Sequence, residues 1–108
     1  MTDPAYTPAY TGVALEADVA PDTVKAVEVG GRSILIVHHG GRLFAVANQC
    51  SHAEQALTCG RVRWGWIACP AHGAKFDLET GEALSLPATD PIATFPLRIT
   101  EGRIEIAV

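Results

Sequence analysis

The chain has 108 residues, of which 48% are hydrophobic and 19% charged, and its formal net charge at pH 7 is −4. This length and composition predict one globular domain with a buried core. The acidic balance argues against nucleic acid and against an anionic membrane surface as the main partner. No apolar run exceeds five residues, and both residues 34–37 and residues 43–47 are far too short to span a bilayer; the start of the chain also lacks the pattern of an export signal. We therefore expect a cytoplasmic protein without a membrane anchor.

Short strands are the elements that the first half of the chain predicts. Residues 24–29 form a candidate strand that is closed by a Gly-Gly pair. Residues 33–38 are strongly β-prone, and residues 42–47 are their expected partner across a glycine-rich turn at 39–41. The last two of these strands predict a β-hairpin.

The C-terminal segment predicts another hairpin. Apolar residues fall at positions 95, 97 and 99 before the turn at Glu101-Gly102, and at positions 104, 106 and 108 after it. Alternation with period two indicates antiparallel strands that have one buried face. Pro96 has no N–H to donate to a neighbouring strand, so its strand is expected at an edge of the sheet.

No segment shows a long helical period, although residues 14–19 and 53–57 could each form one helical turn. Several short strands separated by glycine and proline turns predict an all-β protein, built as a small antiparallel β-sandwich or barrel. The segment between the two hairpins holds all three cysteines of the chain, and it is predicted to be an insertion carried on this β base.

Two short clusters in that insertion contain candidate metal ligands. The first is Cys50-Ser51-His52 and the second is Cys69-Pro70-Ala71-His72, with the 16 residues 53–68 between them. Zinc suits Cys and His, but its common finger sites place both cysteines in one cluster and both histidines in the other. One thiolate and one imidazole from each cluster suit two metals side by side. Such a set fits a [2Fe–2S] cluster with two Cys on one iron and two His on the other.

These clusters and their surroundings resemble the Rieske signature, C-x-H followed by C-x-x-H. The resemblance continues through F-D-L-E-T-G at 76–81, L-P-A-T-D-P at 86–91 and F-P-L at 95–97, and the strand at 42–47 fits the one that precedes the first ligand loop. It covers roughly residues 24–106. The chain is most similar to the small Rieske-type ferredoxins of bacterial ring-hydroxylating dioxygenase systems.

The resemblance implies a Rieske fold over a single domain, residues 1–108. Its base would comprise about 10–46 and 87–108, and its cluster-binding lobe about 47–86. Cys50 and Cys69 would bind one iron of a [2Fe–2S] cluster, and His52 and His72 the other. The protein would carry electrons from an NAD(P)H-dependent flavin reductase to a terminal oxygenase through contacts near the His ligands, and would not itself be an enzyme. The aromatic substrate would be chosen by the oxygenase, which is another chain.

The resemblance also implies a low reduction potential. High-potential relatives carry a disulfide at the positions of Gln55 and Ala71 here, and hydroxyl donors at the positions of Ala74 and Phe76. Neither Ala74 nor Phe76 can donate a hydrogen bond from its side chain, so reduction, which adds negative charge, is disfavoured. The remaining cysteine, Cys59, is expected to pack as a free thiol.

Two further pairs of residues, Trp64 with Trp66 and His38 with His39, could have structural or functional roles. Trp64 and Trp66 share one parity, which suits either an amphipathic strand that packs them in the core or a tight hairpin that bends at Gly65. An exposed tryptophan as a docking anchor is the alternative. His38 and His39 are adjacent in a strand and would point to opposite faces, so they are expected to be ordinary residues beside a turn rather than an iron site.

Two other functions remain open on sequence alone. The small subunit of an assimilatory nitrite reductase shares the Rieske fold, and some of those relatives lack cluster ligands. A structural zinc module in a binding protein would use the same Cys and His residues for a single ion.

Overall fold

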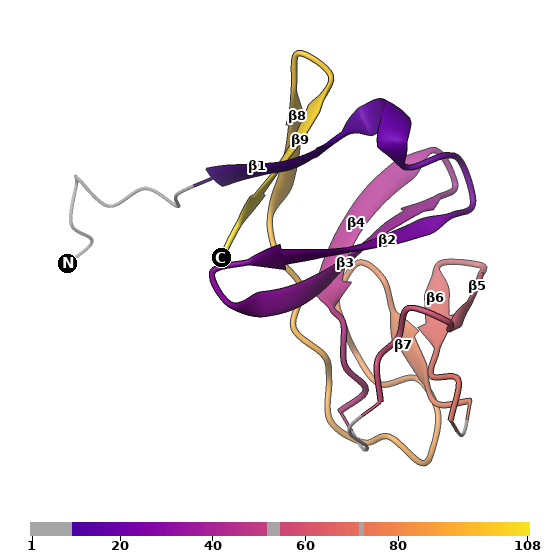
Figure 1. Ribbon diagram of the computed structural model, residues 1–108. Coiled ribbons are helices and arrows are strands. Elements are labelled where there is room, and N and C mark those ends of the chain that lie inside the picture. The colour runs from indigo at the N-terminus through magenta and orange to yellow at the C-terminus, as the bar shows by residue number, and fades with distance from the viewer. Residues whose placement is uncertain (1–9, 52–54, 72) are drawn as a thin grey trace, which may run out of the picture.

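The structure is a computed structural model that describes residues 10–51, 55–71 and 73–108. These residues form nine short strands and one 3₁₀ turn, η1 (Glu16–Asp18), arranged as three antiparallel sheets (Figure 1). The strands are β1 (Tyr10–Leu15), β2 (Val24–Val29), β3 (Arg32–His39), β4 (Arg42–Ala47), β5 (Arg61–Arg63), β6 (Trp66–Ala68), β7 (Lys75–Asp77), β8 (Leu97–Thr100) and β9 (Arg103–Ala107). The prediction of an all-β fold is confirmed.

Two of the sheets, β1-β9-β8 and β2-β3-β4, pack against each other and form the base. Ile34 and Ile36 of β3 meet Ile104 and Ile106 of β9 between the sheets, and all four side chains are fully buried. Burying a side chain of this size contributes about 1.5–3 kcal/mol, so this layer is a main source of stability. The predicted sandwich base is confirmed.

Strand β3 is buried on both of its faces. Residues 34–37 are all 0% exposed, and alternate side chains point in opposite directions. Ile34 and Ile36 enter the core of the base, whereas Leu35 and Val37 enter a second core that contains Cys50 and Cys69. A central strand covered on both faces therefore accounts for the run of four consecutive large apolar residues at 34–37.

The third sheet, β5-β6-β7, lies at one end of the molecule (Figure 1). It belongs to the segment between β4 and β8, which folds back onto the second face of β3 and β4. Ile67 of β6, Phe76 of β7 and Leu78 are fully or almost fully buried against Leu35 and Val37. The inserted segment thus shares a core with the base.

The predicted strands at 24–29 and 42–47 match β2 and β4 at both ends. The C-terminal hairpin is also confirmed, with Glu101 and Gly102 at φ of 51° and 76° in its two-residue turn. Pro96 comes directly before β8, which pairs with β9 alone and is an edge strand, as expected. Two positions of the alternation are wrong, because Ile99 is 44% exposed and Val108 is 52% exposed rather than buried.

The helical turn predicted at 14–19 is present as η1, whereas the one at 53–57 lies partly outside the described residues. Over the described part of the chain, no helix is long and apolar enough to cross a membrane.

Candidate metal centre

Two loops that begin with a buried cysteine are closed in the same way. The N–H of Cys50 donates to the carbonyl of Gln55 at 2.8 Å, and the N–H of Cys69 donates to the carbonyl of Ala74 at 2.7 Å. The acceptor is five positions further along in both cases, from 50 to 55 and from 69 to 74. Each closed loop contains one predicted histidine ligand in its sequence, but His52 and His72 lie outside the described residues.

The two cysteines pack into one core. Cys50 is 2% exposed and Cys69 is 1% exposed, and both belong to the core formed by the inserted sheet and the second face of β3 and β4. Thiolates are soft ligands that suit iron–sulfur clusters, and an apolar shell limits solvent access to such a group. Two cysteines in one dry region therefore fit a thiolate-ligated metal group. Among the described residues, which contain only two of the four predicted ligands, no three or more His, Cys, Asp or Glu side chains are grouped so that they could hold a metal ion.

The side chain of Asn48 ties together the two ends of the first ligand loop. Its Oδ1 accepts a hydrogen bond from the N–H of Leu57 at 2.9 Å, and its Nδ2 donates to the hydroxyl of Ser33 at 3.1 Å. The segment that enters the loop is thereby fixed both to the segment that leaves it and to β3. The sequence offered no signal for this role, because both partners lie at least nine residues away.

Two further contacts involve the ligand loops, one between the first loop and a distant segment and one within the second loop. The hydroxyl of Ser51 donates to the carbonyl of Asp90 at 2.6 Å, which joins the first loop to residues 86–91. In the second loop, the N–H of Gly73 donates to the carbonyl of Cys69 at 2.9 Å, and Gly73 has a φ of 75°, which glycine adopts without strain.

Ala74 and Phe76 were singled out from the sequence, and both are 0% exposed in the core that holds the two cysteines. Neither side chain has a polar atom, so neither can donate a hydrogen bond to a cysteine sulfur.

The expectation for Cys59 is wrong in one respect, because this residue is exposed rather than packed. It lies in the turn before Gly60, where it contributes to the wall of an open groove.

The turn between β5 and β6 shows which arrangement of the tryptophans is correct. Arg63 pairs with Trp66, so the hairpin has a two-residue turn made of Trp64 and Gly65, with φ of 45° and 84°. Trp64 is therefore not a strand residue, and it is 83% exposed rather than buried in the core. Its ring lies 6.1 Å from the ring of the half-buried Trp66, measured between centroids.

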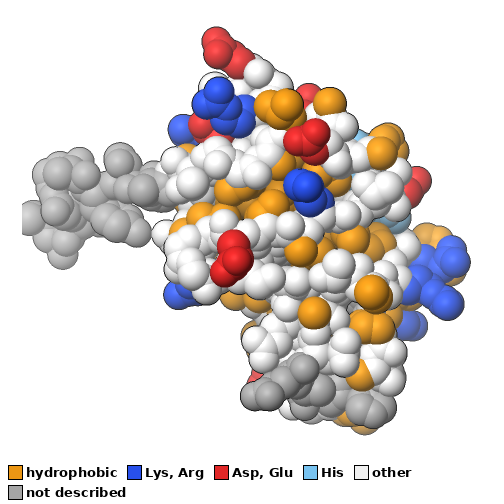
Figure 2. Space-filling model, in the orientation of Figure 1, with side chains coloured by type: hydrophobic (Ala, Val, Ile, Leu, Met, Phe, Trp, Pro, Cys, Tyr) orange, Lys and Arg blue, Asp and Glu red, His pale blue; other side chains and the backbone are white. Residues whose placement is uncertain are grey.

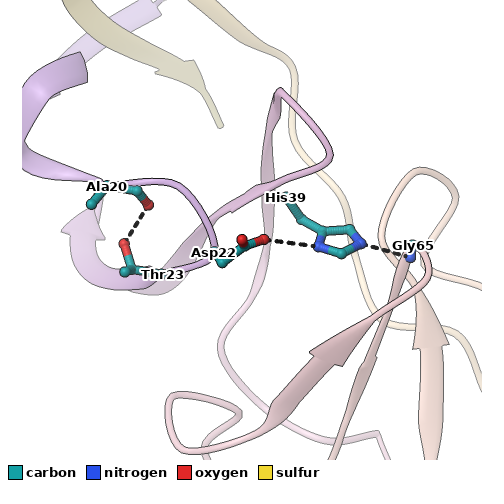
Figure 3. A network of polar contacts seen from close by, with 5 residues as sticks. All are labelled: Ala20, Asp22, Thr23, His39 and Gly65. Carbon is teal, nitrogen blue, oxygen red and sulfur yellow. Dashed lines mark hydrogen bonds and ion pairs between the residues drawn. The ribbon is translucent and has the colours of Figure 1, made fainter.

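His39 connects this turn to the base of the protein (Figure 3). The N–H of Gly65 donates to Nε2 of His39 at 3.1 Å, while Nδ1 of His39 lies 3.5 Å from Oδ1 of Asp22. The neutral ring accepts at Nε2, so its proton sits on Nδ1 and faces the carboxylate. The sequence predicted only an ordinary residue beside a turn and missed this link, because Gly65 is 26 positions away.

His38 has a separate partner, with Nδ1 2.8 Å from the carbonyl of Val19. The two histidines therefore bind different segments and do not converge on a shared site, in agreement with the expectation.

Comparison with known proteins gives a family match over most of the chain. Residues 9–96 match the family model described as the Rieske [2Fe-2S] domain. The 3-phenylpropionate/cinnamic acid dioxygenase ferredoxin subunit of Photorhabdus laumondii is 42% identical over 69% of this chain and 72% of that protein. The biphenyl 2,3-dioxygenase ferredoxin component of Rhodococcus jostii is 37% identical over 84% of this chain and 85% of that protein.

Solved structures show the same fold. The ferredoxin of carbazole 1,9a-dioxygenase from Nocardioides aromaticivorans superposes with a TM-score of 0.87 at 30% identity, covering 92% of this chain and 97% of that one. A chain from a complex of reduced oxygenase and oxidized ferredoxin in carbazole 1,9a-dioxygenase gives 0.85 at 28% identity, covering 94% of each chain. A structure described as a nitrite reductase small subunit gives 0.80 at 16% identity, covering 93% of this chain and 99% of that one, which shows the fold alone.

Proposed function

Because the chain belongs to the Rieske [2Fe–2S] domain family, we propose that it carries single electrons from an NAD(P)H-dependent flavin reductase to a terminal ring-hydroxylating oxygenase. The cofactor of the family is one Rieske-type [2Fe–2S] cluster. The curated relatives are ferredoxin components of dioxygenase systems, so the chain is an electron-transfer component and not an enzyme in itself. The structural observation that carries the proposal is the pair of identically closed loops whose cysteines share one dry core.

The four residues identified from the sequence are the proposed ligands. Cys50 and Cys69 would hold one iron, and His52 and His72, which lie outside the described residues, would hold the other. When bound, the cluster supplies a one-electron redox couple. The chain's own residues hold the two thiolates in place through backbone hydrogen bonds and exclude water from them by burial.

A low potential is part of the proposal. Ala74 and Phe76 bring no hydrogen-bond donor to the buried core around the cysteines, and the chain carries a net charge of −4, so added negative charge is poorly stabilised. We expect a midpoint potential of about −150 mV, toward the low end of the Rieske range. Such a potential suits an acceptor of electrons from a nicotinamide-driven reductase.

The partners follow from the relatives. One solved structure contains a ferredoxin in complex with the oxygenase of its system, which supports an oxygenase as the electron acceptor. The reductase is proposed as the donor because a dioxygenase ferredoxin must be reduced again after each transfer. A nicotinamide-dependent donor implies a cytoplasmic protein. We also propose that the domain, residues 1–108, divides into a base of about 10–46 and 87–108 and a cluster-binding lobe of about 47–86.

Replacement of Cys69 by Ser tests the metal centre, and replacement of Cys59 by Ser is the matched control. The purified wild-type protein should contain about two iron atoms and two acid-labile sulfides per chain. The Cys69→Ser variant should lose most of both, whereas Cys59→Ser should keep them, because Cys59 is exposed and is not a proposed ligand. A single zinc without sulfide in the wild-type protein would identify a structural zinc module instead.

A further inference from the structure

An open groove is lined by residues of β5, β6 and β7 and by Cys69, Pro70 and Gly73 of the second ligand loop. Its volume is about 650 Å³. Among the residues that line it, Arg61, Arg63 and Lys75 are cationic and none is acidic. Cys69 also lines the groove, so anything seated there comes close to a proposed cluster ligand.

The charge of this groove is opposite to that of the protein. The chain has 12 acidic and 8 basic residues, yet three of the eight basic side chains line this one groove. Figure 2 shows Lys and Arg side chains gathered at the edge of the molecule where Figure 1 places the β5–β6 hairpin. The described residues provide no ion-pair partner for Arg61, Arg63 or Lys75. Lys75 instead lies over the ring of Trp66, with Nζ 4.6 Å from its centroid.

Trp64 lies at the rim of this groove and has a backbone conformation that is unfavourable for a bulky aromatic residue. Its φ of 45° is left-handed, and Gly65 follows at 84°, so the turn is of the kind that favours Asn-Gly. A bulky aromatic residue is unusual at such a position, and this one is 83% exposed. Strained residues that expose a functional side chain are characteristic of binding sites, and Trp and Arg are the residues most enriched in binding hot spots.

The turn that presents Trp64 is fixed from the base. Nε2 of His39, whose other ring nitrogen faces Asp22, accepts a hydrogen bond from the N–H of Gly65 at 3.1 Å. This bond fixes the position of the hairpin tip beside the groove. A surface that is held rigid before binding loses less conformational entropy when a partner docks.

We propose that Arg61, Arg63, Trp64 and Lys75 form the docking surface for an acidic patch on the terminal oxygenase. The inference rests on the proposed function, since the oxygenase is the electron acceptor in it. Charge complementarity selects an acidic partner, and the exposed indole supplies the apolar anchor. The groove is open to solvent rather than enclosed, so a small molecule in it would stay partly in water, which favours a protein surface over a small anion. The oxygenase is preferred to the reductase because it is the partner found with a ferredoxin in a solved complex.

The test uses the cluster-containing protein and the terminal oxygenase of the Rhodococcus jostii biphenyl 2,3-dioxygenase, whose ferredoxin component is 37% identical to this chain. Binding of the two oxidised proteins is measured by calorimetry at low and high salt, and thermal stability by circular dichroism. The double variant R61E/R63E should weaken binding at least about tenfold at low salt and remove most of its salt dependence. Trp64→Asn should weaken binding about tenfold at both salt concentrations and leave the unfolding temperature equal to or above that of the wild type.

Arg32→Glu is the matched control, because Arg32 is exposed, starts β3 and does not line the groove. It should change binding less than about twofold under the same conditions. Tighter binding by R61E/R63E, or unchanged binding by both groove variants, would overturn the inference while leaving the proposed function intact. Groove variants that bind the oxygenase normally but no longer bind the reductase would assign the groove to the reductase, and this result would also overturn the inference. A wild-type protein that holds its cluster but neither binds nor reduces the oxygenase would instead refute the proposed function.

Discussion

Replacement of Gly81 by Ala tests how much stability is lost when a side chain is forced into the turn after β7. Gly81 has a φ of 78°, and a Cβ at this position would collide with the carbonyl oxygen of Ile92. The left-handed conformation costs an Ala residue about 1–2 kcal/mol. Relief of the collision must move Ile92, whose N–H donates to the carbonyl of Gly81 at 2.8 Å, and losing that bond costs about 1 kcal/mol more. The expected destabilisation is therefore about 2–3 kcal/mol.

The effect of Gly81→Ala should reach the metal centre. Ile92 packs in the same core as Cys50 and Cys69, so its displacement loosens the packing around both thiolates. Thermal unfolding followed by far-ultraviolet circular dichroism should show a midpoint lowered by about 10 °C or more. The visible absorbance of the cluster, followed at a fixed temperature, should bleach faster than in the wild type.

Gly31→Ala is the control that separates the collision from the backbone conformation. Gly31 has the same φ of 78°, but an added Cβ would meet no atom within 4 Å. Only the conformational cost of about 1–2 kcal/mol applies there. Equal losses of stability in the two variants would show that the contact with Ile92 has no energetic effect, and would refute the reasoning.

Two other predictions concern the link to the hairpin and the C-terminal sheet. His39→Ala should speed hydrogen exchange at the Gly65 amide and lower the unfolding midpoint by about 4–8 °C, because it removes a bond worth about 1 kcal/mol; unchanged exchange would contradict this. The hydrogen bond from Arg98, at 2.6 Å, is the main cause that lowers the pKa of Glu105. Because the pKa of Glu105 is lowered in the folded state, its ionised carboxylate stabilises the fold at pH values above the ordinary pKa of 4.5. This stabilisation is lost as the pH falls through the folded pKa. The difference in unfolding free energy between wild type and Glu105→Gln should therefore shrink on acidification. A gap that grew as the pH fell, followed in unfolding curves from pH 7 downward, would show that the sign is wrong.

Local patterns explain why the base could be predicted from sequence. Strands β2 and β4 carry β-prone residues bounded by glycine turns, and both ends of each were located correctly. The β8–β9 hairpin and its Glu101-Gly102 turn were also predicted from local alternation, although the strands are shorter than the pattern, at Leu97–Thr100 and Arg103–Ala107. Cys50 and Cys69 could be singled out as candidate ligands because thiolates and imidazoles at short fixed spacings serve few purposes other than binding metal, and the structure brings both into one core.

The features that could not be predicted depend on contacts between distant segments. Asn48 acts through Ser33 and Leu57, and His39 acts through Gly65, so neither role leaves a local trace. The sequence left the position of Trp64 open for a different reason. Parity counts assume a continuous strand, and a two-residue turn interrupts the count and points the side chain out to solvent.

Along residues 74–78, side chains that surround the proposed metal centre alternate with a side chain that lines the proposed docking groove. Alternate side chains of a strand point to opposite faces. Ala74, Phe76 and Leu78 are buried in the core that holds the two cysteines, whereas Lys75, between the first two, lines the cationic groove and covers Trp66. A change at the buried positions alters the surroundings of the cluster without altering the docking surface. A change at Lys75 alters the charge that a partner meets without adding a donor beside the thiolates, so potential and affinity can evolve independently on opposite faces of the same strand.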